Sequence, residues 1–475
     1  MPTYFPALLL LLLAWGAFAF GAVYPWAYTP LFWAAAMIGA LGWIAPGSRE
    51  KPRVPWAIVV AVAIVAAATS LQLIPLTPGQ LSSISPAADR FLLRYDLGYV
   101  TVKSALSAAH ASGYRHPLSI DPSATRLGLA ALVALALLLV GTVRGLGTQS
   151  LRTLAAGLVL VGAALALAGI VPSGLYRADP QLSGLVYGFW KPENQASPFG
   201  PFVNRNHFAG WMLLTLPVAI GYFSALVGRG MQGVRPVFRE RVLWFSTPDA
   251  SRVILVGLAV LVMALSLVLT LSRSGMGGFL LAVAISGFVV LRRHAQRSKR
   301  AVTLAYLVLL LALSASWVGL DATASRFTET EGSGLGGRLP IWSDTVKVIR
   351  DFPWTGTGLN TYGASMLFYQ EHGLETHNVE AHNDYLQIAA EGGVLLGIPA
   401  AWLLFVLVRE IRRRFRERAD DEMGYWLRVG ATTALVAIAL QETVEFSLQM
   451  PGIAALVAVV AAIAIRPGQS EPSRS

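Results

Sequence analysis

The sequence has no cysteine, which excludes disulfide bonds and thiolate metal sites. Cysteine usage therefore does not indicate the redox compartment of the protein. It is also poor in charge, because only 13% of its 475 residues are charged, whereas soluble domains carry about 25%. Hydrophobic residues make up 55%, and the mean hydropathy is +0.57. This balance excludes an ordinary soluble protein and predicts an all-α, polytopic integral membrane protein.

The first apolar run has no lysine or arginine before it. Because a secretory signal normally carries a positive segment there, we expect residues 6–23 to be retained as a first membrane span. Eleven further runs are about long enough to cross a bilayer, and no soluble domain is left over, so we expect a single membrane domain over residues 1–475. The twelve runs lie near residues 6–23, 28–45, 55–75, 126–143, 153–171, 207–227, 253–271, 275–291, 301–320, 390–408, 428–444 and 450–465.

Basic residues gather in every second connection between these runs and in the C-terminal tail. Since basic connections stay in the cytoplasm, this pattern predicts that both termini are cytoplasmic. The net charge of +11 comes from these connections. We therefore interpret the run Ile411–Arg418 as a topology anchor and expect no nucleic-acid partner.

The opposite side receives three longer connections, at residues 76–125, 172–206 and 321–390. Loops of such length usually carry function or have structure of their own. The last one is acidic and contains PIWSDTVKVIRDFP, in which Pro340 and Pro353 predict the start and end of a short amphipathic helix. Trp342, Val346 and Ile349 share one face of this helix, which we expect to lie along the membrane surface.

The stretch Thr376–Gly397 joins this polar loop to an apolar run, so it should lie at the membrane–water border. It contains His377 and His382. Asn378 is a plausible helix cap, which would put His382 in the first turns of the helix. The alternative for His382 is a solvated histidine at a helix start.

Three arginines on the same side adjoin membrane spans: Arg205 in FVNRNHFAG, Arg273 in LTLSRSGMGG and Arg338 in GGRLPIW. The two runs that flank Arg273 are together long enough for two crossings, so residues 272–275 should form a tight turn. A guanidinium at this depth needs a partner and has the fork geometry that suits a phosphate. A shared anion site beside His382 is one interpretation, and contact with lipid headgroups is the other.

Other polar residues near this border allow further readings. His207 adjoins Arg205 and is either functional or only a boundary residue. A metal site from His377, Glu380, His382 and Asp384 is an alternative, but their spacing fits no strong ligand pattern, so we expect none. Glu442 and Glu445 in QETVEF could pair with an arginine or position an acceptor.

Several segments together resemble the motifs of the O-antigen ligase and polymerase superfamily: NRNHFAG, TLSRSG, GGRLPIW with FPWTGTGLNTYG, and AHNDYLQIAAEGGVLLG. The similarity covers a core region of about residues 195–400. The resemblance implies a bacterial inner-membrane enzyme that transfers a glycan from a polyprenyl-pyrophosphate carrier to an acceptor hydroxyl on the periplasmic face. It also implies inversion at the sugar carbon, with no metal or other cofactor.

Carried over by motif, the resemblance implies that Arg205 and Arg273, with Arg338, bind the pyrophosphate and that His382 acts on the acceptor. Asn383, Glu442 and His377 would support the acceptor. The acceptor itself, lipid or saccharide, stays open among a ligase, an O-antigen or exopolysaccharide polymerase and a protein O-oligosaccharyltransferase. The rival from another class is a transporter, but transporters place ionisable groups near the bilayer midplane, whereas these predicted spans are nearly free of charge.

Overall fold

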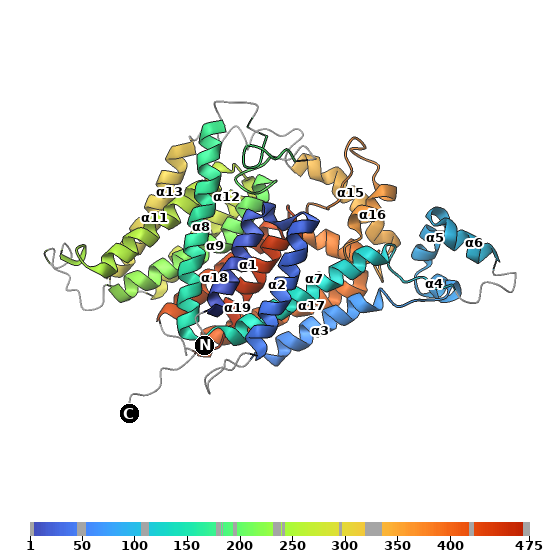
Figure 1. Cartoon of the computed structure of the whole chain (residues 1–475), viewed down its shortest axis with the longest axis horizontal. Coiled ribbons are helices and arrows are strands. Elements are labelled where there is room, and N and C mark those ends of the chain that lie inside the picture. Colours follow the sequence, from blue (N-terminus) through green and yellow to red (C-terminus); the bar gives the residue numbers. More distant parts are fainter. Residues whose placement is uncertain are drawn as a thin grey trace.

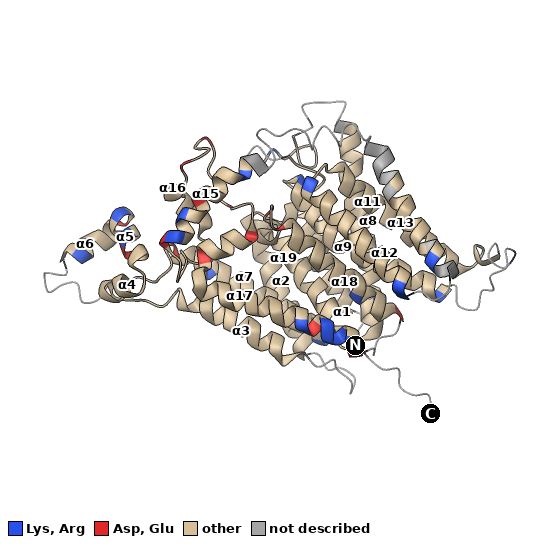
Figure 2. Ribbon diagram, turned by 180° about the vertical axis from the view of Figure 1, so that it is seen from behind, with Lys and Arg blue, Asp and Glu red and all other residues tan. Residues whose placement is uncertain are grey.

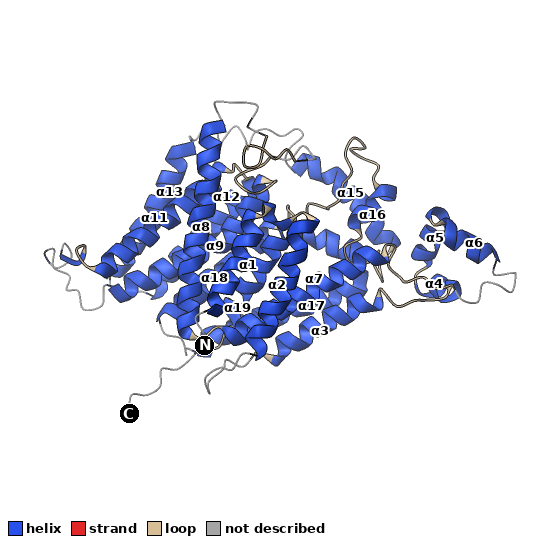
Figure 3. Ribbon diagram, in the orientation of Figure 1, coloured by secondary structure: helices blue, strands red, loops and turns tan. Residues whose placement is uncertain are grey.

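The computed structural model describes residues 4–44, 54–105, 114–176, 182, 184–192, 197–230, 239, 243–293, 297–318, 335–417 and 422–468. Over these ranges the regular structure is helical, as Figure 3 shows, and the all-α prediction is confirmed. Eight of the described helices are long and apolar enough to cross a membrane, which makes the chain a polytopic membrane protein. They are α2 (Pro25–Ile44), α7 (Pro122–Gly145), α8 (Thr148–Tyr176), α9 (Arg205–Gly230), α11 (Pro248–Leu269), α12 (Arg273–Arg293), α17 (Asp384–Glu417) and α18 (Glu422–Gln441).

The other four predicted runs also fall on helices, namely α1 (Tyr4–Phe18), α3 (Trp56–Leu71), α13 (Arg297–Val318) and α19 (Pro451–Ile465). Three of these, α1, α3 and α19, are shorter than 18 residues. Helix α1 ends before the predicted boundary at residue 23 because the backbone turns to positive φ at Phe20 (60°) and Gly21 (71°). The number of twelve spans stays a prediction.

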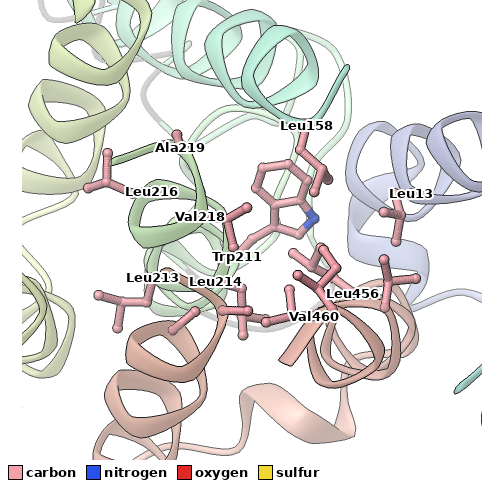
Figure 4. Packing of buried hydrophobic residues seen from close by; sticks show 14 of the residues in the cluster. Leu13, Leu158, Trp211, Leu213, Leu214, Leu216, Val218, Ala219, Leu456 and Val460 are labelled. Atoms are coloured by element: carbon pink, nitrogen blue, oxygen red, sulfur yellow. The ribbon is translucent and has the colours of Figure 1, made fainter. Parts of the chain in front are cut away.

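Helix α9 is the centre of the bundle, since 89% of its 18-residue apolar stretch is buried inside the protein. Figure 4 shows Trp211 of α9 packed beside Leu158 of α8 and Leu456 of α19. Helix α18 lies so close to α9 that a Cβ on Gly430 would approach the Pro217 carbonyl oxygen to 2.4 Å. Small residues at such crossings let membrane helices pack by direct backbone contact.

Four helices begin with the same local signal, a capping side chain followed by proline. Thr77, Ser85, Asp121 and Thr247 each accept a hydrogen bond from a backbone N–H of the helix that follows. Proline suits the first helical position because its missing N–H would have no partner there. These starts were therefore encoded locally, and they include two spans, α7 and α11.

The connections at 76–125 and 321–390 fold against each other as short helices: α4 (Pro78–Ile84), α5 (Pro86–Tyr95), α6 (Leu97–Ala105), α15 (Leu335–Asp351) and α16 (Tyr362–Tyr369). Figure 1 shows α4, α5 and α6 at one side of the bundle, next to α15 and α16. They share a second core, separate from the main one, which includes Leu81, Phe91, Tyr99, Val348, Phe352 and Tyr362. Residues 321–334, with Asp321, Arg326, Glu329 and Glu331, lie outside the described residues.

The predicted amphipathic helix exists, but its predicted start was wrong. Helix α15 begins at Leu335, so Pro340 lies inside it and does not open it, while its end at Asp351 agrees with Pro353. Its most buried face carries Asp344, Thr345 and Val348, because this face packs on the second core.

Helix α17 is broken at Gly393, where φ is 51° and ψ is −151°. The segment from Pro353 to Gly358 docks into this break. Its Pro353 and Trp354 carbonyl oxygens accept from the N–H groups of Val394 and Leu395, both at 2.9 Å. These hydrogen bonds join the segment after α15 to the membrane helix α17.

Helices α9, α12 and α17 begin at one end of the bundle, and we call this the site end. They finish at the opposite end, which we call the basic end. Figure 2 shows basic residues where α12 and α17 finish, on the side of the bundle where the two termini lie. A tight turn separates α11 from α12 as predicted, but the predicted position at 272–275 was wrong: the turn lies at residues 270–272, because α11 ends at Leu269 and α12 begins at Arg273.

Candidate active site

Three helix N-termini converge at the site end, and each has a polar cap. The side chains of Asn204, Ser272 and Asn383 accept from the N–H groups of Asn206, Gly275 and Leu386, at 2.8, 3.2 and 3.0 Å. Arg205 is the first residue of α9 and Arg273 is the first residue of α12, and both are half-buried. Helix N-termini carry partial positive charge and favour anions, and the two arginines add to that field.

The loop between α18 and α19 joins these helix starts. At its first turn, Gln441 donates through Nε2 to the Asn206 carbonyl oxygen at 3.0 Å. Asn383 donates through Nδ2 to the Thr443 carbonyl oxygen at 2.9 Å, and Asp384 N–H donates to the Glu442 carbonyl oxygen at 3.1 Å. Segments more than 200 residues apart, such as 206 and 441, are therefore held at one place.

Glu445 is the most connected carboxylate of this loop. Its Oε1 accepts from Arg338 at 2.5 Å and from the Ser274 hydroxyl at 3.4 Å, and its carboxylate also bonds the Asn206 side chain. Its side chain is 1% exposed, and burial raises the pKa of Glu445, while Arg338 opposes that rise. The predicted pairing of one of the two glutamates with an arginine is confirmed for Arg338.

Glu442 and Asp384 form a buried carboxyl pair linked by a hydrogen bond. Glu442 Oε2 accepts from Ser447 N–H at 2.7 Å, and Asp384 Oδ1 accepts from Gln449 Nε2 at 2.9 Å. Burial, together with the negative charge of Asp384, raises the pKa of Glu442 to about 10. Because two carboxylates in contact cannot both ionise, the pair holds one proton at neutral pH.

His382 lies just before α17 and adopts a left-handed backbone with φ of 49°. Its ring meets Phe446 edge to face at 4.6 Å, and His207 meets the same phenyl ring at 4.6 Å. Burial, and after it the positive charge of Arg338, lowers the pKa of His382 to about 4. The imidazole is therefore neutral at pH 7 and can accept a proton.

The site end also concentrates unsatisfied polar atoms. Among the described residues, thirteen buried side-chain nitrogen and oxygen atoms have no hydrogen-bond partner. Seven of them lie here, on His207, His382, Asp384, Gln441, Glu442, Glu445 and Ser447. The proton shared by Asp384 and Glu442 can account for two carboxyl oxygens. The other five unsatisfied atoms, His382 Nδ1 among them, are typical of a site that binds a polar ligand.

The structure brings together most of the predicted residues, namely Arg205, Arg273, Arg338, His382, Asn383 and Glu442. It leaves His377 apart, on an exposed loop. The predicted helix cap was wrong: Asn383 caps α17, whereas the N–H of Asn378 donates to the Gln370 side chain at 3.0 Å. His382 consequently precedes the helix and is not in its first turns.

For the metal alternative, the described residues contain no group of three or more His, Asp or Glu side chains placed to hold an ion. Sequence reasoning missed Phe446 and Gln449. Neither carries a charge, and only their contacts with His382 and Asp384 reveal them.

One comparison with known proteins gives a match. A family model described as O-antigen ligase matches residues 258–401. The chain carries an O-antigen ligase domain. No curated protein matches the chain.

The O-antigen ligase domain contains α12 with Arg273, α15 with Arg338, and His382. Arg205, Glu442 and Glu445 lie outside the matched residues. Glu445 nevertheless pairs with Arg338, and Glu442 is hydrogen-bonded to Asp384, so the candidate site extends beyond the matched residues. The chain is accordingly a polytopic membrane protein that contains an O-antigen ligase domain over residues 258–401.

Proposed function

We propose that the chain is a metal-independent glycosyltransferase that moves a glycan from a polyprenyl-pyrophosphate carrier to an acceptor hydroxyl. The observation that supports this most is the cluster of unsatisfied buried polar atoms at the meeting point of three helix N-termini. Arg205, Arg273 and Arg338 supply cationic groups there, and His382 supplies a neutral base. The arginines bind an anionic leaving group, and His382 accepts the proton of a hydroxyl acceptor.

In the proposed reaction, the acceptor oxygen bonds to the anomeric carbon while the bond from that carbon to the pyrophosphate oxygen breaks. The electron pair leaves with the polyprenyl pyrophosphate, and the arginines stabilise its charge. The hydroxyl proton passes to His382. Attack from the face opposite the leaving group inverts the configuration at carbon.

The low pKa of His382 suits this sequence of events. Arg338 contributes to the depression, so pyrophosphate bound beside Arg338 would offset its charge. The pKa of His382 would then rise toward the range in which a general base works near neutral pH. Donor binding would thereby prepare the base for the acceptor.

We place the site end at the periplasmic face of a bacterial inner membrane and the basic end in the cytoplasm. The arginines at the ends of α12 and α17 support this placement through the preference of basic residues for the cytoplasm. A carrier lipid can then lie against the bundle with its headgroup at the arginines. Both termini would be cytoplasmic.

The test is glycan transfer by purified protein in nanodiscs, with a chelator present. The donor is polyprenyl-pyrophosphate-linked glycan, and the acceptor is membrane lipid, both extracted from the bacterium that makes the protein. A general base contributes about 100- to 10,000-fold, so His382→Ala should lower the rate by that factor and leave binding of polyprenyl pyrophosphate unchanged. The matched control His377→Ala, on the exposed loop, should transfer near the wild-type rate.

A wild-type rate in His382→Ala would contradict the proposal for the base and direct attention to Glu380. Loss of activity in chelator that a divalent ion restores would contradict the metal-independent route. Product size separates the acceptor classes, because a polymerase lengthens the glycan on its carrier whereas a ligase moves it to another lipid.

A further inference from the structure

Ala381, the residue before His382, is held from two sides by side chains of two different helices. Ala381 is fully buried. Its carbonyl oxygen accepts from Trp342 Nε1 of α15 at 3.0 Å, and its N–H donates to Gln387 Oε1 of α17 at 3.0 Å. A buried residue whose N–H and C=O are both bonded to side chains cannot change its backbone angles without losing a hydrogen bond.

The orientation of Gln387 is itself fixed. Its Nε2 donates to the carboxylate of Glu391, one turn further along α17, at 3.3 Å. Glu391 is buried and accepts the N–H groups of Asn360 and Tyr362, at 2.8 and 3.0 Å. The amide oxygen of Gln387 is therefore left facing Ala381.

The residues after His382 are fixed as well. Asn383 caps α17 and donates to the Thr443 carbonyl oxygen, and Asp384 N–H donates to the Glu442 carbonyl oxygen. His382 alone between these anchors has a positive φ, 49°, which non-glycine residues rarely adopt. Such a backbone persists only when its neighbours impose it.

Trp342 also lies four residues after Arg338 on the same helix, and residues so spaced share one face. Helix α15 thus offers one side chain to the ion pair with Glu445 and another to the peptide before His382. We propose that Trp342 and Gln387 are positioning residues that hold His382 in register with Arg338. This inference rests on the proposed function, because it assigns them an effect on the base and not on the donor.

Trp342→Phe is the sharpest test, because it keeps an aromatic ring and removes only the N–H donor. Misplacement of a catalytic group by about 1 Å can cost about 100-fold, so we expect kcat for glycan transfer to fall about 10- to 100-fold. The KM for the donor and the affinity for polyprenyl pyrophosphate should stay within about twofold. Trp354→Phe is the matched control, since its side chain is 69% exposed and belongs to the adjacent loop.

Gln387 offers a second variant. Gln387→Met keeps the length and loses the acceptor for Ala381 N–H, so kcat should fall as in Trp342→Phe. Gln387→Glu retains an acceptor oxygen and should restore part of that loss.

A double-mutant cycle tells positioning from general damage. If Trp342 acts through His382, Trp342→Phe should have no further effect on the residual rate of His382→Ala. An equal loss in both backgrounds would overturn the inference, as would a wild-type kcat in Trp342→Phe. His382→Ala at the wild-type rate would instead contradict the proposed base, whatever Trp342 does.

Discussion

Charged side chains are buried at both ends of the bundle, but the two ends differ in how many of the buried polar atoms have hydrogen-bond partners. At the basic end, Arg414 pairs with Glu410 and Glu417, at 2.5 and 2.9 Å, and donates to the Ile465 carbonyl oxygen at 3.0 Å. Arg428 donates to the carbonyl oxygens of Ala464 and Arg466. Within the described part of the chain, no buried side-chain atom of Glu410, Arg414 or Arg428 lacks a partner.

The site end has the opposite character. Its carboxyl groups and histidines are as deeply buried, yet seven buried atoms there have no partner in the described ranges. The arginines of the basic end bind the last carbonyl groups of α19, where a helix C-terminus favours cations. Burial of charge is therefore common to both ends of the bundle, whereas seven of the thirteen unsatisfied buried atoms of the described residues gather at the site end.

In the comparison of the two ends, the largest effect should come from Arg338, which pairs with Glu445 at the site end. Arg338→Gln removes a cation from the anion site, and losing one such donor typically costs about 100- to 1,000-fold in rate. The amide can still donate to Glu445, and Glu445, whose pKa is already raised by burial, can take up a proton when the cation is gone, so the fold should be kept. Transfer in nanodiscs measures the effect, and Arg350→Gln, an exposed position near the end of the same helix, should be unaffected.

The corresponding change at the basic end should act on stability. Arg414→Gln leaves Glu410 buried, and breaking a buried ion pair costs about 3–5 kcal/mol. Its neighbour Arg413 also pairs with Glu410, but its side chain is 51% exposed against 6% for Arg414, so Arg413→Gln should cost no more than about 1 kcal/mol. Unfolding followed by tryptophan fluorescence in detergent measures both, and the chain has thirteen tryptophans to report it.

These two experiments separate the ends. Arg338→Gln should transfer slowly and melt near the wild type, and Arg414→Gln should melt early and transfer normally per folded molecule below its melting temperature. If Arg338→Gln instead transfers normally and melts early, the buried charges of the site end stabilise the fold, as those of the basic end do.

Local signals carried much of this arrangement. Length and apolarity predicted the helices, and the proline that follows a cap marks the starts of α7 and α11. The turn before Arg273 followed from counting residues across the bilayer. The motif residues Arg205, Arg273, Arg338 and His382 were found because each is a charged or titratable side chain beside an apolar run.

What failed depended on partners distant in sequence. Asn378 and Asn383 are equally good caps by type, and the choice was made by Thr443 and Gln370, which bind Asn383 and Asn378. The packing of residues 76–105 and 114–121 on residues 335–390 has no local signature either. Gln72 donates to the carbonyl oxygens of Thr355 and Glu391, which lie 283 and 319 residues away in the sequence. No sequence pattern predicts such a hydrogen bond.

The smallest expected effect concerns Glu380, which lies beside the site on the loop before α17. Burial, and then the charge of Asp384, raises the pKa of Glu380 from 4.5 to about 7. The folded state therefore holds this proton more tightly than the unfolded state does. Its stabilising contribution is full below pH 4.5 and is lost as the pH rises through about 7.

Glu380→Gln removes that loss, because a neutral amide does not titrate. The melting temperature of Glu380→Gln minus that of the wild type should be about 1–3 °C larger at pH 8 than at pH 5. Glu375→Gln changes an exposed residue of the same loop and should give equal differences at both pH values. If Glu380→Gln also gives equal differences, then Glu380 does not titrate in this window, and the buried protons of the site end belong to Glu442 and Glu445.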